Sequence, residues 1–201
     1  MFGDSLELDI ALVRAARAGL GPTATLCVDA GCSWSTAEDA LLRGAAFAEF
    51  GVEWIEEPTL QENIGVYAQI CAGMEGAAVR IAGGEASDTV RMAEDFIVNG
   101  GAHIIQIDVG RIGGLTSAYR VRQLAEQHGR VFVNHTFKSH LSIAAALHVM
   151  ATSTTSELME FPRKLHDSPP RQCHGAPAHL TGGCGAFSLE QKARLRSQRT
   201  W

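Results

Sequence analysis

The chain has 201 residues, of which 46% are hydrophobic and 19% charged, and its formal net charge is −5. This composition is typical of an ordinary globular chain rather than a disordered one, and the negative balance argues against nucleic acid or an anionic membrane as a partner. No apolar run approaches the roughly 20 residues of a membrane span. Acids at Asp4, Glu7 and Asp9, with no basic segment before them, argue against a signal peptide.

The cysteines indicate a reducing compartment. The chain has five of them, an odd number, and their spacing fits no disulfide framework. We therefore expect free thiols and a cytoplasmic location.

Charge divides the chain into two parts near residue 162. Residues 161–201 hold seven Lys or Arg and two acids, a net of +5, whereas residues 1–160 have a net of −10. We predict a folded domain over residues 1–162, followed by an irregular basic tail over residues 163–201. The loss of pattern after Arg163 suggests that the tail is disordered, or that it is an out-of-register end of a translated fragment.

Residues 5–161 repeat one pattern, in which an alanine-rich amphipathic stretch is followed by a short β-branched run. Apolar residues at helical spacing predict helices over residues 5–18, 36–50, 62–75, 88–99, 115–128 and 140–151, with Thr36 and Asp88 as candidate N-caps. The intervening runs predict strands over residues 25–29, 54–56, 79–82, 104–108, 131–134 and 158–161.

Strands that alternate with helices in this way form a parallel sheet. An open doubly wound sheet would give a similar rhythm, but here an ionisable residue ends six strands in a row, and the carboxyl edge of a TIM barrel is where catalytic groups lie. The predicted fold is therefore an α/β (β/α)8-type barrel. It is incomplete, because about six units are present and a whole barrel usually needs about 250 residues.

Three carboxylates end consecutive strands: Asp29, Glu56 and Glu85. Neighbouring strands lie about 5 Å apart, so these side chains would repel one another unless a cation lay between them. Oxygen ligands of this kind suit Mg²⁺, and the three residues are the predicted metal site. Taken singly, each could instead cap a helix or pair with a basic residue. Glu57 competes with Glu56, and we favour Glu56 because adjacent strand residues face opposite sides.

Asp108 and His135 end the next two strands. A carboxylate that accepts a hydrogen bond from one ring nitrogen fixes the histidine tautomer and makes the ring more basic, so this pair is a candidate acid–base dyad. The alternative is a structural hydrogen bond. Glu160, at the end of the sixth predicted strand, is a candidate hydrogen-bond donor if protonated. A cation beside such a base suggests removal of the proton next to a carboxylate, with an enediolate intermediate.

The motifs that carry these residues resemble one known family. In chain order they are Val28-Asp29-Ala30-Gly31, Trp54-Ile55-Glu56-Glu57-Pro58, Gly84-Glu85, the segment from Asp108 to Gly114, and Asn134-His135-Thr136. Together they resemble the mandelate racemase subgroup of the enolase superfamily, the mandelate racemase/muconate lactonizing enzyme family, over residues 5–161. The resemblance implies that Asp29, Glu56 and Glu85 bind Mg²⁺, that His135 and Asp108 form the general base dyad, and that Glu160 bonds the substrate.

Members of this subgroup with a His–Asp dyad are mostly acid-sugar dehydratases, and a few are racemases or epimerases. The resemblance thus implies a lyase acting on a sugar acid, with a racemase or epimerase as the alternative, and a homo-oligomer in the longer form. A third alternative is an inactive fragment, because the N-terminal capping domain and the basic residues of the second barrel strand have no counterpart in this sequence.

Two further residues are candidate substrate contacts. Trp34, five residues after Asp29, is predicted to line the pocket mouth, with a buried packing role as the alternative. Lys138, three residues after His135, is the other candidate, with a solvated loop position as its alternative.

Overall fold

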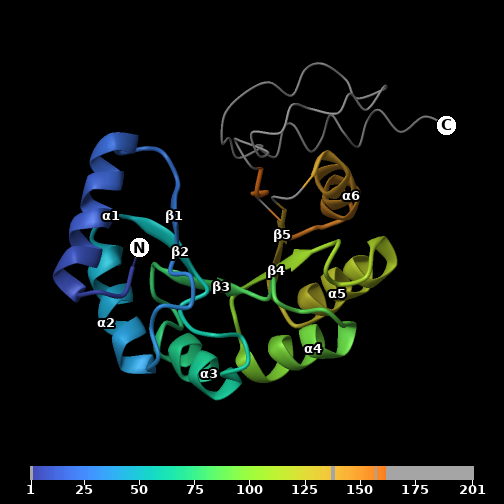
Figure 1. Ribbon diagram of the computed structural model, residues 1–201, viewed down its shortest axis with the longest axis horizontal. Helices are drawn as coiled ribbons and strands as arrows, with labels where there is room; N and C mark the ends of the chain where they lie inside the picture. Colours follow the sequence, from blue (N-terminus) through green and yellow to red (C-terminus); the bar gives the residue numbers. More distant parts are fainter. Residues whose placement is uncertain (1, 137–138, 157, 162–201) are drawn as a thin grey trace.

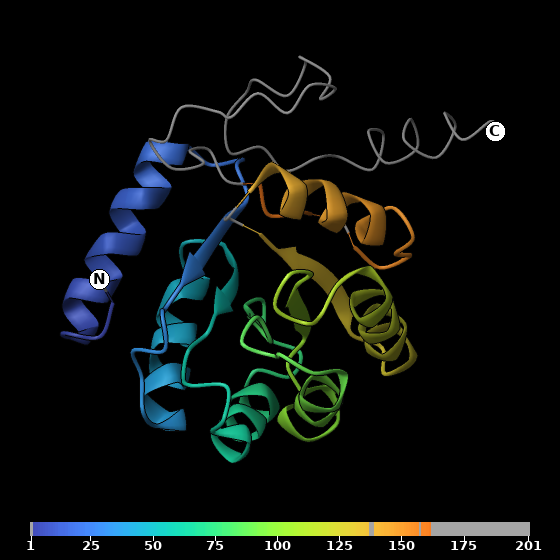
Figure 2. The ribbon, with the colours of Figure 1, turned by 45° about the vertical axis from the view of Figure 1, so that its right-hand side comes forward.

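Five parallel strands form a curved sheet with helices along its outer side (Figure 1). The computed structural model describes residues 2–136, 139–156 and 158–161. Within these ranges the strands lie in sequence order and are β1 (Leu26–Asp29), β2 (Val52–Glu56), β3 (Arg80–Gly83), β4 (Ile104–Asp108) and β5 (Val131–His135). Figure 2 shows the same arc turned by 45°. The arrangement is an incomplete TIM barrel, as the alternation of elements predicted.

Each predicted helix is present with ends close to those expected. The helices are α1 (Leu6–Leu20), α2 (Ala37–Ala48), α3 (Ile64–Gly73), α4 (Val90–Asp95), which continues into the π-helix η1 (Phe96–Gly100), α5 (Leu115–Gln127) and α6 (His140–Met150). Thr36 is confirmed as an N-cap, because its side chain accepts a hydrogen bond from the backbone N–H of Asp39. The prediction of Asp88 was wrong: the cap of α4 is Thr89, whose hydroxyl accepts from Met92.

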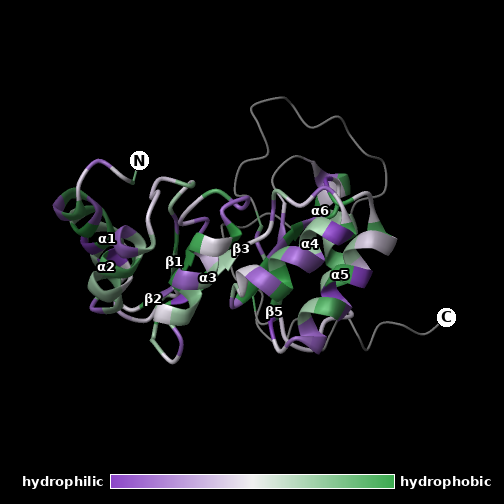
Figure 3. Cartoon of the chain, turned by 90° about the horizontal axis from the view of Figure 1, so that it is seen from below, coloured by the Kyte–Doolittle hydropathy of each residue, from purple (hydrophilic) through white to green (hydrophobic). Residues whose placement is uncertain are grey.

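The sheet has two apolar faces that pack against different partners. On the outer face Ile55, Ile81 and Phe132 are fully buried beneath the helices and belong to the main core. On the inner face a smaller cluster contains Trp54, Ala82, Ile104 and Val133. In Figure 3, hydrophobic residues lie along β1, and both hydrophobic and hydrophilic residues occur on α4 and α5. Burial on both faces explains the nearly continuous apolar runs of these strands.

The sixth predicted strand is not formed. Residues 158–161 are described but belong to no strand. At the outer edge of β5, the side chain of Asn134 takes the place of a backbone partner. Its Nδ2 donates to the carbonyl oxygen of Glu160 at 2.9 Å, and its Oδ1 accepts from the N–H of Glu160 at 3.0 Å. An amide side chain therefore satisfies the backbone groups that a strand ladder would otherwise pair.

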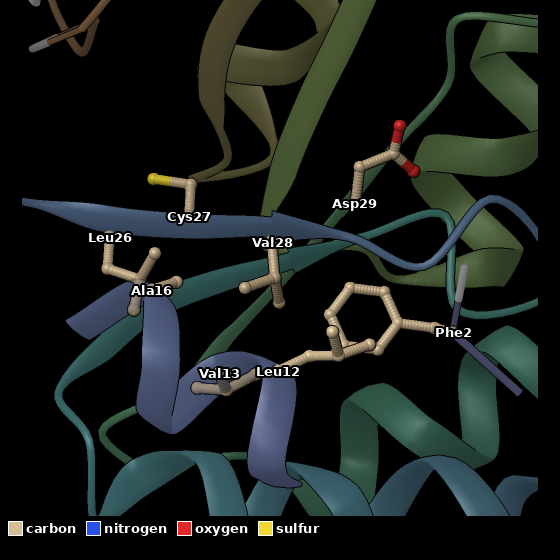
Figure 4. A pocket seen from close by; sticks show the side chains of 8 residues that line it. All are labelled: Phe2, Leu12, Val13, Ala16, Leu26, Cys27, Val28 and Asp29. Carbon is tan, nitrogen blue, oxygen red and sulfur yellow. The ribbon is translucent and has the colours of Figure 1, made fainter. Parts of the chain in front are cut away.

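Strand β1 lies at the other end of the described sheet and pairs only with β2 there. Between β1 and α1 lies a mostly apolar pocket of about 330 Å³ (Figure 4). Its lining comprises Phe2, Leu12, Val13, Ala16, Leu26, Cys27, Val28 and Asp29.

Three of the five cysteines lie in the described ranges, and each is a free thiol, as predicted: Cys27, Cys32 and Cys71. Burial raises the pKa of each thiol to about 12, so they are protonated at neutral pH and unsuited to act as thiolates. Over the same part of the chain, no helix combines the length and the apolar character that crossing a membrane requires.

His103 connects β3 and β4 through its ring as well as its backbone. Its Nδ1 accepts a hydrogen bond from the N–H of Ile81 at 3.0 Å, so this nitrogen carries no proton and the ring is neutral. Burial lowers the pKa of His103, against the opposing charge of Glu75. Because the unfolded chain then binds this proton more readily, stability is full above the unfolded pKa of about 6.5 and falls as the pH drops toward the lower folded pKa.

We therefore expect His103→Gln to be less stable than the wild type by about 1 kcal/mol at pH 7.5, where it loses a buried hydrogen bond. The difference should shrink as the pH falls to 5, because the wild type alone loses the contribution of this residue. Urea unfolding at both pH values measures the effect, with the exposed His128→Asn as the matched control. A difference that stays constant with pH would contradict the assignment.

Candidate active site

Alternation along the strands brings the acidic strand ends to the inner face of the sheet. Figure 4 shows Cys27 and Asp29 on one side of β1, opposite Leu26 and Val28, which face α1. Cys27 packs against the inner cluster, so Asp29 lies on the inner side as well. Glu56 follows Trp54 by two residues and shares its face for the same reason.

Strand register then determines which of these groups are neighbours. Asp29 is the pairing partner of Glu56 across β1 and β2, and Asp108 is the partner of His135 across β4 and β5. The ladder continues beyond β1 into the loop, where the N–H of Ala30 donates to the carbonyl oxygen of Glu56 at 2.8 Å. The members of each predicted pair are therefore neighbours, and both pairs lie at the same edge of the sheet.

Glu57 leaves the strand and turns elsewhere. Its φ of 42° lies in the left-handed region that non-glycine residues rarely adopt, and its carboxylate accepts a hydrogen bond from the thiol of Cys32, with Sγ and Oε2 3.5 Å apart. The structure thus separates the two adjacent glutamates, and Glu56 is the one aligned with Asp29.

Glu56 is in an unfavourable environment for a charged carboxylate. Burial raises its pKa to about 7, a hydrogen bond from Gln106 opposes this shift, and the negative charges of Asp29, Glu160 and Glu85 add to it. The inner edge of the sheet therefore concentrates acidic groups that disfavour one another's ionisation.

Glu85 is placed by the turn that follows β3. Gly84 has a φ of +118°, and a Cβ there would lie 2.9 Å from the carbonyl oxygen of Gln106, so only glycine lets this turn pack against β4. The carboxylate of Glu85 has two partners: Oε1 accepts from Nη1 of Arg111 at 2.7 Å, and Oε2 lies 2.8 Å from Nε2 of His135. Burial alone would raise the pKa of Glu85, but His135 and Arg111 hold it below its usual value.

Asp108 and His135 are almost fully buried and in contact. Nδ1 of the ring lies 3.2 Å from Oδ2 of Asp108, whose other oxygen accepts from the backbone N–H groups of Gly110 and Arg111. Burial lowers the pKa of His135, but the hydrogen bond and charge of Glu85, together with Glu160 and Asp108, more than offset it and raise the pKa. This is the geometry of an oriented, basic histidine.

Glu160 also reaches this edge, although its segment is not a strand. Its Oε2 accepts a hydrogen bond from the N–H of Thr136 at 2.5 Å. Burial raises the pKa of Glu160, while the hydrogen bond from Thr136 and the charge of His135 act in the opposite direction. A raised pKa favours the protonated form that could donate a hydrogen bond.

The three predicted metal ligands do not form a finished metal cage. Within the described ranges, no group of three or more His, Cys, Asp or Glu side chains is placed to hold a metal ion, and Glu85 is paired with Arg111 and His135 instead. The chemistry of the set nevertheless fits Mg²⁺. Asp29 and Glu56 are register neighbours with oxygen donors, and the pKa of Glu56 is raised first by burial and then by the neighbouring carboxylates, an environment that a hard divalent cation would offset.

Of the two predicted substrate contacts, Trp34 is found in the packing position. Only 2% of it is exposed, and its ring contacts Phe2 and Phe47 at centroid distances of 6.3 and 6.2 Å, with the guanidinium of Arg43 5.2 Å from its centroid. Placing it at a pocket mouth was therefore wrong for this structure, because the loop after β1 folds the ring into the core. Lys138 lies outside the described residues.

Two residues of this site were not singled out from the sequence. Gln106 lies two residues before Asp108 on the same strand face and hydrogen-bonds Glu56. Arg111 lies within the glycine-rich segment from Asp108 to Gly114. A basic residue three positions after a predicted catalytic acid is the signal that could have identified Arg111.

The chain belongs to the enolase C-terminal domain-like family, whose model matches residues 1–186. Among curated relatives, D-galactarolactone cycloisomerase from Agrobacterium fabrum is 32% identical over 76% of this chain and 39% of the relative. L-talarate/galactarate dehydratase from Salmonella typhimurium is 33% identical over 69% of this chain and 34% of the relative. The chain therefore spans between a third and two fifths of the length of these relatives.

Solved structures agree with the fold and with the family. A predicted mandelate racemase from Rhodobacter sphaeroides superposes with a TM-score of 0.75 at 38% identity, covering 81% of this chain and 41% of that one. A racemase from Streptomyces coelicolor with bound magnesium gives a TM-score of 0.70 at 30% identity, covering 79% and 42%. The relatives include dehydratases, cycloisomerases, epimerases and racemases.

The environment of Glu56 gives a prediction about the protein without metal. Because its folded pKa of about 7 lies above the ordinary glutamate value of 4.5, its contribution to stability is full below pH 4.5 and is lost as the pH rises through 7. Glu56→Gln removes the buried charge, and we expect it to be more stable than the wild type by about 1–3 kcal/mol at pH 8 in EDTA. At pH 4.5 the gain should be absent.

Chemical unfolding of both proteins in EDTA at the two pH values measures this difference. Glu62→Gln, which changes an exposed glutamate in a loop, is the matched control and should have the same stability as the wild type at both pH values. Equal stabilities of Glu56→Gln and the wild type at pH 8 would show that no buried charge is relieved.

Proposed function

We propose that this chain is part of a Mg²⁺-dependent lyase that removes the proton next to a carboxylate group of a sugar acid and then expels water. The observation that carries the proposal is the pairing of Asp108 with His135 at one edge of the sheet, beside the carboxylates of Asp29, Glu56 and Glu85. Dehydratases among the relatives that the chain matches support the same reaction class.

Asp29, Glu56 and Glu85 are the residues we propose as magnesium ligands, which is consistent with the magnesium in a neighbouring structure. Bound there, Mg²⁺ would stabilise the negative charge that develops on the substrate carboxylate as the proton leaves.

The proton itself is assigned to His135. Asp108 faces Nδ1 and orients the ring, so Nε2, on the opposite side, is the nitrogen that takes the proton from carbon. The same nitrogen then returns a proton to the departing hydroxyl group, which leaves as water. Glu160, whose raised pKa favours the protonated form, donates a hydrogen bond to an oxygen of the substrate.

A racemase or epimerase is the second candidate, because epimerases and racemases also occur among the relatives. Such a reaction needs a proton donor on the second face of the carbon atom. Dehydration is our first candidate because one acid–base group, His135, can both take the proton and return one to the departing hydroxyl. An inactive fragment is the third candidate, since the chain spans at most two fifths of its first curated relatives.

The proposed setting is a cytoplasmic homo-oligomer that binds a small carboxylate and neither nucleic acid nor a membrane. The net charge of −5 supports the exclusion of nucleic acid and of an anionic membrane, the odd number of cysteines supports a reducing compartment, and the oligomer rests on the family resemblance.

Incubation of the chain with a library of acid sugars and Mg²⁺, followed by mass spectrometry, tests the function. Dehydration gives a product lighter by one water, and EDTA should abolish it. In D₂O, racemisation would instead replace the substrate proton by deuterium, so the substrate becomes heavier and no water is lost. A chain that gives neither signal and no Mg²⁺-dependent rise in melting temperature would support the fragment alternative.

His135→Asn should lower the rate of water loss by at least about a hundredfold, because it removes the proposed acid–base group. The rate of water loss is measured with the substrate that gives the strongest signal in the library. His128→Asn, at an exposed position at the end of α5, is the matched control and should retain the activity. A variant of His135 with wild-type turnover would rule out the dyad.

A further inference from the structure

Arg111 connects the two halves of the candidate site. Its Nη1 donates to Oε1 of Glu85 at 2.7 Å and to the backbone oxygen of the same residue at 3.2 Å. Its backbone N–H donates to Oδ1 of Asp108 at 3.1 Å. One residue therefore holds both the turn after β3 and the acid of the dyad, with its own side chain 31% exposed.

The hold on Glu85 has a consequence for His135. With Oε1 bound by Arg111, the second oxygen of Glu85 lies 2.8 Å from Nε2 of His135, while Asp108 faces Nδ1. Carboxylates thus face both ring nitrogens, and the one that we assign to proton transfer is covered. The contacts form a closed ring that runs from Arg111 through Glu85 and His135 to Asp108 and back to the backbone of Arg111.

We propose that Arg111 is a positioning residue that holds Glu85 against Nε2 of His135, a contact that we call the latch. Glu85 leaves this contact when the site takes up Mg²⁺. The inference rests on the proposed function, because it assumes that Glu85 is a magnesium ligand. The two roles of Glu85 compete: while its oxygen atoms are bound by Arg111 and His135, they are not available to a cation beside Asp29 and Glu56. Uptake of the cation and exposure of Nε2 are then one event, so the base is uncovered only in a loaded site.

Competition of this kind predicts the direction of the effect of mutation. Arg111 stabilises the metal-free arrangement by a charge-assisted hydrogen bond, so removing it favours the arrangement that binds the cation. We expect Arg111→Gln to bind Mg²⁺ about fivefold more tightly than the wild type. In the metal-free protein the same variant should loosen the contact between Glu85 and His135.

The experiment uses the whole 201-residue chain and two measurements besides activity. Calorimetry gives the dissociation constant of Mg²⁺. NMR of ¹⁵N-labelled imidazole rings at one fixed pH, with the His135 signals assigned by their loss in His135→Asn, reports the partner of Nε2. Arg91→Gln is the matched control, because Arg91 is 86% exposed and its nearest acid lies 3.9 Å away. Arg111→Lys tests rescue, since it keeps a cation near Glu85.

The latch is supported if Arg111→Gln moves the His135 signals in EDTA and tightens Mg²⁺ binding, while Arg91→Gln does neither and Arg111→Lys returns both toward the wild type. It is overturned if the His135 signals do not move in Arg111→Gln, or if that variant binds Mg²⁺ more weakly, which would mean that Arg111 presents Glu85 to the metal. If the latch is overturned in either way but the wild type still binds Mg²⁺, the proposed function stands. If neither the wild type nor any variant binds Mg²⁺, both the latch and the proposed metal site are overturned.

Discussion

Repulsion between carboxylates at the ends of parallel strands is the constraint on which this site depends. Parallel pairing in register puts Asp29 beside Glu56, and side-chain alternation turns both toward the inner face. Burial and neighbouring charge then raise the pKa of Glu56 to about 7. A site of this kind is stabilised by protonation, by a basic partner or by a cation. The structure uses the second of these for Glu85, which is paired with Arg111 and His135.

Much of the fold could be predicted because the spacing of apolar residues and the β-branched runs are local signals. Helical spacing located α5 and α6 to within about a residue at each end, and β-branched runs located β4 at its observed limits. The pairing of Asp108 with His135 followed as well, because consecutive parallel strands place their carboxyl ends side by side. Fold class and dyad thus depend on chain order and strand direction, which a single sequence contains.

The remaining features depend on side-chain choices that periodicity does not encode. Residues 158–161 form no strand, and the amide of Asn134 pairs with the backbone of Glu160 there, a side-chain contact of which an apolar run gives no sign. Trp34 packs into the core because its loop folds back over α2. Glu85 contacts Arg111 and His135 because a carboxylate is stabilised by basic partners within reach and destabilised by other carboxylates.

The position of each acid in the sheet also determines how strongly it responds to its neighbours. Glu56 lies on β2, between β1 and β3, so protein covers it on both sides. Asp29 lies on β1, which pairs with one strand in the described sheet, and it is exposed. Solvent screens charge at such an edge, whereas the interior does not. The electrostatic cost of ionisation is therefore concentrated at Glu56, while the carboxylate of Asp29 is the more exposed of the two.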